Sequence, residues 1–469
     1  MDSLSEVRLV CSSLRGTLET YGIRNVVGQA WEKLVLDPRR YAQVHGEDCM
    51  PIAHSRSVFA AGDSAQQTIF LFCHCYFPDS TGGTERFAEN LASALLRAGN
   101  QVYILTYSAR VHTAYPAQIS GILYMEETIN NIPVIRFRHQ RAPVGILKNF
   151  TEGDPEIEGF AAFLFQKYHP DLVHFLHLSR VNGFAAACRK NGIPYLVTAT
   201  DFFAVCHFYT RIDRTGCICP GSIQGKRCKM ECPVRQVKNL ELRYQNAAHL
   251  LKNAKQVIVP SSYAAAVLQQ EFSGLEVVVI PHGIDSGQKN RRNGPVRRFA
   301  FVGKIAAIKG IFSLVQVFRR MPEECSLDIY GDGSIPDRHK LRRLAEGDGR
   351  IRFHGTVPAS QVCEIYRQAD CVVIPSVVPE SYNFVIREAL QNRCLVVAAR
   401  VGAMPEAVSE GENGFLFSCG DREELYQGMM WAYQFCWTTY RQVDFQQIWQ
   451  EGACYRMLYR EIERDGSSE

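Results

Sequence analysis

The sequence of 469 residues has no long hydrophobic segment and no strong charge of either sign. A run of about 18 consecutive apolar residues, the minimum for a membrane-spanning helix, does not occur. Lysine and arginine total 52 and the acidic residues total 48, which leaves a formal net charge of +4. Because duplex nucleic acids are normally bound by a concentrated basic face, no nucleic-acid partner is expected.

Signals for export are also missing from the sequence. Residues 1–15 contain neither the basic stretch nor the apolar stretch of a secretory signal peptide. Repeats and low-complexity tracts are absent as well. What is present, 46% apolar and 21% charged residues, is typical of a folded protein with two or three domains. These properties predict a cytoplasmic protein, with a peripheral contact to a membrane left open.

Residues 1–62 are predicted to form a helical N-terminal extension. Leu4 and Val7 begin an apolar pattern at helical spacing, and a second such pattern ends at Asp37-Pro38. Up to position 40 the chain carries six basic and five acidic side chains, so a strong anchor to an anionic membrane is not indicated. A helical cap on the next domain is therefore favoured over a contact with a membrane or a partner.

Apolar segments of strand length alternate with helical segments through the rest of the chain, which predicts parallel sheets covered on both faces. The fold class is therefore α/β, with two Rossmann-like domains at 63–287 and 288–440 and a ligand cleft between them. Residues 441–469 are predicted to form a helix that crosses back to the first domain. The expected strands are 68–73, 102–106, 171–176, 195–198, 299–302, 326–330, 351–354, 371–374 and 394–398.

The strongest chemical signal is a pair of glutamates, Glu380 and Glu388, which follow the expected strand 371–374. Eight residues of continuous helix span about 12 Å, roughly the distance from a ribose to a sugar across a diphosphate. Glu380 is expected in the loop before a helix, Ser381 or Asn383 near its N-cap, and Glu388 inside it. The exposed N–H groups of the helix start would then face an anion.

This stretch resembles the E-x7-E motif of the retaining GT-B glycosyltransferases of family 4. The resemblance covers residues 67–465 and implies two facing domains that transfer a sugar, with retention, from a nucleotide-sugar donor to an acceptor hydroxyl. A glycan or a glycolipid is the implied acceptor, in polysaccharide or glycolipid synthesis. Other matching segments are Gly82-Gly83, Val259–Ser262, Pro281–Asp285, His354-Gly355, Ala369-Asp370, Ala399–Gly402, Glu406 and Gly411–Gly414.

The resemblance also implies how the donor would be held. Gly303, Lys304 and Lys309 match the phosphate clamp of the family, G-R-x4-K-G, with a lysine in place of the usual arginine. In the family, the residue matching Glu388 bonds ribose hydroxyls and the residue matching Glu380 lies by the donor sugar. Lysines and a helix terminus would neutralise the phosphates, so no catalytic metal is expected.

The remaining donor contacts are expected from small and polar residues. Gly82 and Gly83 allow close approach of the backbone to the diphosphate or the sugar. Ser381 and Asn383 complete the donor-binding set at the start of the helix. Lys304, Lys309 and Glu380 are also counted as catalytic candidates.

The sequence departs from the family after the expected strand 195–198. Many members carry His-Asp there, and that histidine contacts the donor sugar and contributes to catalysis. This chain has Thr200 instead, and a hydroxyl does not supply the protonation chemistry of an imidazole. Asp201 is retained and is the fourth catalytic candidate. His174 and His177 match a family pattern at the preceding strand and are expected to be structural rather than catalytic.

Cysteine is plentiful, with 17 residues, and five of them lie in one polar stretch, 206–232. Some family members have a similar Cys-rich insertion. Thiolates at such spacing suit a tetrahedral zinc ion that braces the loop beside the acceptor cleft. Iron–sulfur ligation is less expected, and free thiols in a loop remain the alternative. The candidate ligands are Cys206, Cys217, Cys219, Cys228 and Cys232.

Three other functions stay open at this point. A GT-B sugar-nucleotide epimerase would release a new nucleotide sugar without an acceptor. A non-catalytic protein, suggested by Thr200, would bind a nucleotide and transfer nothing. A metal-dependent interaction module would lose its partner, and not its donor binding, when Cys228 and Cys232 are replaced by serine.

Overall fold

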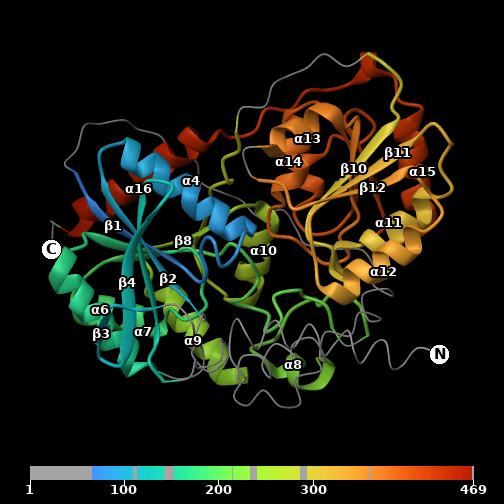
Figure 1. The fold of residues 1–469 in the computed structure, drawn as a ribbon. Coiled ribbons are helices and arrows are strands. Elements are labelled where there is room, and N and C mark those ends of the chain that lie inside the picture. Colours follow the sequence, from blue (N-terminus) through green and yellow to red (C-terminus); the bar gives the residue numbers. More distant parts are fainter. Residues whose placement is uncertain are drawn as a thin grey trace.

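The computed structural model describes residues 66–108, 114–141, 153–213, 215–232, 240–285, 293–358 and 361–466. It contains two α/β domains that lie side by side, each built on a largely parallel sheet (Figure 1). The predicted fold class is therefore confirmed. The expected helices of the N-terminal extension lie outside the described residues, and the borders at 62, 287 and 440 stay predictions. In the part of the chain that the structure describes, no helix is both long enough and apolar enough to cross a membrane.

The first domain has a nine-stranded sheet in the order β3-β4-β5-β2-β1-β6-β7-β8-β9. Its strands are β1 (Thr68–Cys73), β2 (Gln101–Tyr107), β3 (Ala117–Ile119), β4 (Ile122–Ile129), β5 (Ile132–His139), β6 (Leu172–Phe175), β7 (Tyr195–Thr198), β8 (Gln256–Val259) and β9 (Val277–Val279). Its helices are α4 (Gly83–Arg97), α6 (Pro155–Tyr168), α7 (Asn182–Lys190), α8 (Lys226–Glu231), α9 (Leu240–Lys252) and α10 (Ser262–Glu271).

Two parts of this sheet were not predicted from the sequence, namely the edge formed by β3, β4 and β5 and the parallel strands β8 and β9. Strands β3, β4 and β5 pair antiparallel and form an edge of the sheet. The exposed face of β4 breaks the continuous apolar pattern by which the buried parallel strands were recognised, because one side of this strand meets solvent. Ser120 and Asn131 lie in the turns between these strands with φ of 51° and 64°, a conformation favourable for short polar residues.

The second domain has a six-stranded parallel sheet in the order β12-β11-β10-β13-β14-β15. Its strands β13 and β14 are buried throughout, as expected for apolar segments covered by helices on both faces. Its strands are β10 (Arg298–Val302), β11 (Ser326–Tyr330), β12 (Ile351–Gly355), β13 (Cys371–Ile374), β14 (Leu395–Ala399) and β15 (Gly414–Phe417). Its helices are α11 (Ile311–Phe318), α12 (Ile335–Ala345), α13 (Val362–Gln368), α14 (Phe384–Gln391) and α15 (Arg422–Tyr433).

The last helix, α16 (Ile448–Gly466), returns to the first domain and lies beside α4 (Figure 1). Tyr455, Leu458 and Tyr459 join the buried cluster beneath β1. The hydroxyl of Tyr459 lies 2.6 Å from Nδ1 of His174 in the sheet. Burying each such aromatic or aliphatic side chain contributes about 1.5–3 kcal/mol to stability. The C-terminal segment thereby ties the two domains together by its packing.

Candidate active site between the two domains

Each sheet has a topological switch point, where the order of its strands changes direction, near the boundary between the domains. In the first sheet the chain moves from β1 to one side and later adds β6 on the other, and in the second it does the same at β10 and β13. Such points leave a crevice at the carboxyl ends of the strands, where ligands of open α/β sheets bind. The candidate residues follow β1, β6 and β7 in the first domain and β10 and β13 in the second.

Glu380 follows β13 and lies at the centre of a hydrogen-bond network in the second domain. Its Oε1 lies 2.8 Å from Nζ of Lys309 and accepts a hydrogen bond of 2.6 Å from Ser376 Oγ, while Asn383 donates to Oε2 at 3.0 Å. Burial alone would raise the pKa of this carboxyl, but the charge and hydrogen bond of Lys309 and the two neutral donors outweigh it, so the pKa is lowered. Glu380 is therefore a charged, oriented carboxylate.

Two glycines allow the backbone to approach this network closely. Gly310 has φ of 68°, and a Cβ added to it would lie 1.8 Å from the carbonyl oxygen of Pro375. Gly402 has φ of 63°, and a Cβ there would lie 2.4 Å from the backbone nitrogen of Glu380. The N–H of Ala403 also donates to the carbonyl of Glu380 at 2.9 Å. The two loops therefore fix the lysine and the glutamate against each other.

Glu388 lies inside α14 and faces the first domain. It is 6% exposed, and its Oε2 accepts a hydrogen bond of 2.8 Å from Tyr366. Its Oε1 forms an ion pair with Arg86 in the first turns of α4. Burial raises the pKa of Glu388, against the opposing effects of Arg86 and Tyr366. The predicted ribose anchor is thus held by an arginine of the opposite domain, a residue that the sequence reasoning missed although it follows Gly82-Gly83 closely.

The start of α14 matches the prediction for the loop before the helix. Asn383 is the N-cap, and its side chain accepts a hydrogen bond from the N–H of Ile386 at 3.0 Å. Ser381 instead reaches across the domain boundary, where its hydroxyl donates to the carbonyl of Thr200. Ser261 Oγ in turn donates to the carbonyl of Ser381 at 2.6 Å. One predicted donor residue caps the helix and the other contacts the first domain.

The glycine pair lies opposite this helix. A Cβ added to Gly83 would lie 3.4 Å from the ring of Phe384, and one added to Gly82 would lie 2.6 Å from the carboxylate of Glu85. Thr84 Oγ1 lies 2.9 Å from Thr200 Oγ1, which also donates to the carbonyl of Leu176 at 3.0 Å. The threonine that replaces the histidine of the family is therefore engaged in hydrogen bonds at the domain boundary.

His177 and Asp201 form a hydrogen-bonded pair at the carboxyl ends of β6 and β7. His177 Nε2 lies 3.0 Å from Asp201 Oδ2, while Nδ1 accepts the N–H of Ser179 at 3.0 Å. Because a backbone N–H can only donate, the proton of the neutral imidazole is on Nε2 and points at Asp201. Burial opposes ionisation of Asp201, but His177 and the N–H of Phe203 outweigh it and lower the pKa of the carboxyl. We expected His177 to be structural, yet it contacts a catalytic candidate.

His174 behaves differently although it is only three positions away. It is fully buried, with Nδ1 at 2.6 Å from Tyr459 Oη and Nε2 at 2.7 Å from Thr198 Oγ1. Burial lowers the pKa of His174 to about 3. This environment fits the structural role that was expected for it.

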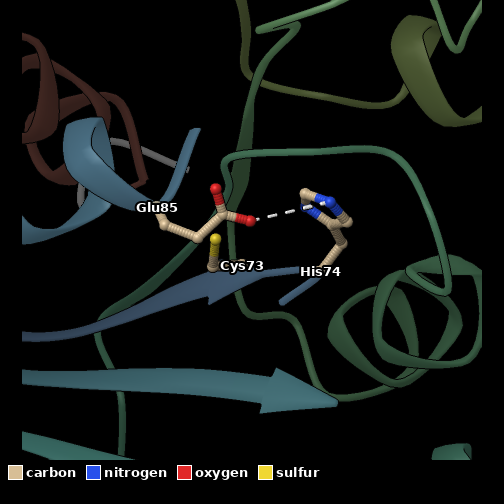
Figure 2. Close-up of side chains that lie close together, drawn as sticks. All are labelled: Cys73, His74 and Glu85. Atoms are coloured by element: carbon tan, nitrogen blue, oxygen red, sulfur yellow. Dashed lines mark ion pairs between the residues drawn. The ribbon is translucent and has the colours of Figure 1, made fainter. Parts of the chain in front are cut away.

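Three further residues, Cys73, His74 and Glu85, meet between β1 and α4 (Figure 2). His74 stacks on His177 with ring centroids 3.9 Å apart, and its Nε2 lies 3.9 Å from Oε1 of Glu85. In the part of the chain that the structure describes, these three form the one group with ligand atoms all within 4.8 Å of one another. Glu85 is 2% exposed, and burial raises its pKa in spite of hydrogen bonds from Ser80 and backbone N–H groups. The carboxyl of Glu85 therefore accepts hydrogen bonds from backbone N–H groups at the N-terminus of α4.

Two further sets of predicted residues remain predictions. Lys304 is exposed at the end of β10, whereas Lys309 forms an ion pair with Glu380, so the two lysines of the predicted phosphate clamp have different surroundings. Of the five cysteines, four line one small cavity, while Cys217 is not among the residues that line it. The four that do so are Cys206, Cys219, Cys228 and Cys232.

Comparisons with known proteins find matches to both domains. Residues 81–288 match the family model described as Glycosyltransferase Family 4, and residues 296–434 match the one described as Glycosyl transferases group 1. The D-inositol 3-phosphate glycosyltransferase of Corynebacterium glutamicum is 39% identical over 129 residues, which are 25% of this chain and 30% of that protein. Sulfoquinovosyl transferase SQD2 of Arabidopsis thaliana is 34% identical over 126 residues, 26% of this chain and 24% of that protein. The match thus spans less than a third of the length of these relatives.

Solved structures show the same fold over both domains. Sucrose-phosphate synthase from Thermosynechococcus elongatus superposes with a TM-score of 0.60 at 19% identity, covering 85% of this chain and 99% of that chain. Anabaena HepE, in complex with UDP and glucose, does so with a TM-score of 0.57 at 18% identity, covering 86% and 100%. These likenesses establish the GT-B fold. The two family models, which match successive parts of the chain, place this protein in the glycosyltransferases of family 4 and group 1.

Proposed function

We propose that this chain is a retaining glycosyltransferase that moves a sugar from a nucleotide-sugar donor to a hydroxyl of an acceptor. The observation that carries the proposal is the placement of Glu380 and Glu388. Both lie at the end of the second sheet that faces the first domain, one paired with Lys309 and the other with Arg86. Retention follows from the family and not from the geometry.

The donor is proposed to lie along the start of α14. Glu388 would accept hydrogen bonds from the ribose hydroxyls once Arg86 is released from it. Lys304 and Lys309, with the N–H groups of the helix start, would meet the diphosphate. Glu380 would lie by the sugar, oriented by Asn383.

The chemistry of Lys309, Asp201 and His177 suits departure of a nucleoside diphosphate from the donor sugar. As the bond to the anomeric carbon breaks, negative charge grows on the leaving phosphate, and a preorganised lysine stabilises it without rearrangement. On the other side of the sugar, the lowered pKa keeps Asp201 ionised, and its hydrogen bond from His177 fixes its orientation. The pair of His177 and Asp201 is therefore proposed to position the acceptor hydroxyl and to stabilise the positive charge that develops on the sugar.

Uridine diphosphate sugars are the first donors to test. The solved complex of HepE contains UDP and glucose, and that of the pneumococcal O-GlcNAc transferase GtfA contains UDP and GlcNAc. The acceptor is proposed to be a glycan or a glycolipid that enters over the first domain beside Asp201. A glycolipid acceptor would require a peripheral contact with a membrane, which sedimentation with lipid vesicles would detect.

The proposal is tested first by binding and then by product analysis. Thermal denaturation is measured with UDP, GDP, ADP and their common sugar conjugates, and a ligand at 100 times its Kd should add about 2.7 kcal/mol of stability. The stabilising donor is then incubated with and without acceptor glycans, and products are separated by mass. Release of a new nucleotide sugar without acceptor would indicate an epimerase, and binding without any product would indicate a non-catalytic protein. Stabilisation by none of the nucleotides would contradict the proposal.

A further inference from the structure

The Cys-rich segment 206–232 has little hydrophobic core of its own. Within its described residues the one regular helix is α8, and the local buried cluster consists of Cys228 and Leu240, with Phe208 and Cys232 packed against it. Ile212, by contrast, is 2% exposed and belongs to the core of the second domain. A metal or disulfides commonly stabilise small segments whose own core is this limited.

Four thiols from this segment surround one small cavity. Cys206, Cys219, Cys228 and Cys232 line a volume of about 20 Å³, room for one water-sized sphere. The ligand atoms of Cys73, His74 and Glu85 all lie within 4.8 Å of one another, whereas the sulfur atoms around this cavity do not all lie that close together. Binding one ion would therefore require the loop and the short helix that carry these cysteines to close around it.

Two buried arginines stand beside these thiols. Arg211 lines the cavity and is 3% exposed, and Arg243 lines a neighbouring cavity and is 4% exposed. Their hydrogen bonds include Tyr263 Oη and the carbonyl of Cys219 for Arg211, and the carbonyls of Phe203 and Ala204 for Arg243. Glu271 lines the same cavity as Arg211, and the charge of Asp201 acts on Arg243, so the two guanidinium groups lie among acidic side chains as well as thiols. Positive charges beside cysteines favour the thiolate form.

We propose that Cys206, Cys219, Cys228 and Cys232 bind one zinc ion. Four thiols lose their protons to solvent, four Zn–S bonds of about 2.3 Å form, and the sulfurs draw to about 3.8 Å from one another. The complex carries a net charge of −2, which Arg211 and Arg243 balance. With four thiolates bound, no position is left for a substrate, so the ion is structural. Cys217 is not a ligand.

The zinc site links the candidate active site to both domains. Cys206 follows Asp201 in the same loop, and the ring of Phe203 packs on His177 with centroids 5.4 Å apart. Farther along the segment, Ile212 pairs with Ile218 in an isolated bridge and packs into the core of the second domain. Closing the four thiols on an ion therefore fixes the loop of Asp201 at one end and the contact with the second domain at the other.

The test is metal analysis of the full chain, purified without chelator. We expect about one zinc per chain, with much less in Cys206→Ser and Cys228→Ser and an unchanged amount in Cys217→Ser, the matched control. Cobalt exchanged into the protein should show the intense near-ultraviolet absorption of thiolate-to-cobalt charge transfer and the visible bands of tetrahedral coordination. Because misfolding of a serine variant would also release zinc, the zinc of the wild type is removed with a chelator as a second measurement. Removal should lower Tm, and added zinc should restore it.

Several results would overturn the proposal. They are a wild-type chain without zinc, four cysteines found in disulfides by mass spectrometry after alkylation, iron with sulfide in place of zinc, or equal loss of zinc from Cys217→Ser and Cys228→Ser. None of these measurements uses a nucleotide sugar, so the zinc site and the proposed glycosyl transfer succeed or fail separately.

Discussion

The two sides of the domain boundary are built in different ways. On the second domain, Ser376, Glu380 and Asn383 come from one short segment, and Lys309 is the one distant contributor to their network. On the first domain, the pair of His177 and Asp201 and the residues stacked on it come from the ends of three separate strands. A site made within one segment is visible as a motif, whereas a site made by sheet order is visible only after folding.

The largest effect is expected from breaking the network of the second domain. Lys309→Ala removes the cation that pairs with Glu380 and that is proposed to stabilise the leaving phosphate, so kcat should fall about 10²–10³-fold. Steady-state kinetics with the donor found by thermal denaturation measure this change. Lys255→Ala, an exposed lysine of the first domain, is the control. An unchanged kcat in Lys309→Ala would remove this lysine from the reaction.

Glu388 tests whether the other carboxylate serves the donor. Glu388→Ala should weaken donor binding by about 1–3 kcal/mol, the cost of losing a hydrogen bond to a charged group. Titration calorimetry with the nucleoside diphosphate measures this change in affinity. Glu364 is an exposed glutamate in α13, and the control variant Glu364→Ala should bind with the affinity of the wild type. If the affinity of Glu388→Ala equals that of the wild type, the ion pair with Arg86 is a structural contact between domains and not a donor site.

His177 tests the first-domain side of the comparison. His177→Ala removes the hydrogen bond that orients Asp201, so turnover should fall about tenfold, equivalent to ~1.4 kcal/mol, while the Kd for the nucleoside diphosphate stays the same. Kinetics and titration on the same preparation separate the two effects. Should turnover and affinity both match the wild type, the pair would have no part in the reaction. A loss of affinity for the nucleoside diphosphate without a loss of turnover would instead assign the pair of His177 and Asp201 to donor binding.

Sequence reasoning reached the fold and the second-domain site for physical reasons. Strands such as β13 are buried on both faces and therefore read as continuous apolar runs. The sequence allowed either Ser381 or Asn383 near the N-cap, and the structure has Asn383 there. Arg86 and Glu85 escaped notice because a helix start often carries charged residues, and Glu388, the partner of Arg86, lies far along the chain. Which cation meets Glu388 depends on the approach of the two domains, and no spacing within one sequence encodes it.

The smallest effect expected concerns His174, the buried neighbour of His177. Burial lowers its pKa to about 3 from 6.5, so the folded state excludes the proton that the unfolded chain binds. The stability that His174 contributes is therefore complete above pH 6.5 and is lost as the pH falls toward 3. Between pH 6.5 and 5.5 this loss is about 1 kcal/mol in the free energy of unfolding.

Urea denaturation at the two pH values measures that loss. It should disappear in His174→Gln, which cannot titrate, and persist in His169→Gln, whose imidazole is exposed at the end of α6. An equal pH dependence in His174→Gln and the wild type would mean that this imidazole is accessible to protons in the folded state. His174 and His177 would then differ less than their contacts indicate. We distinguish a buried structural imidazole at position 174 from one that serves the site at position 177 because the folded protein keeps protons from His174.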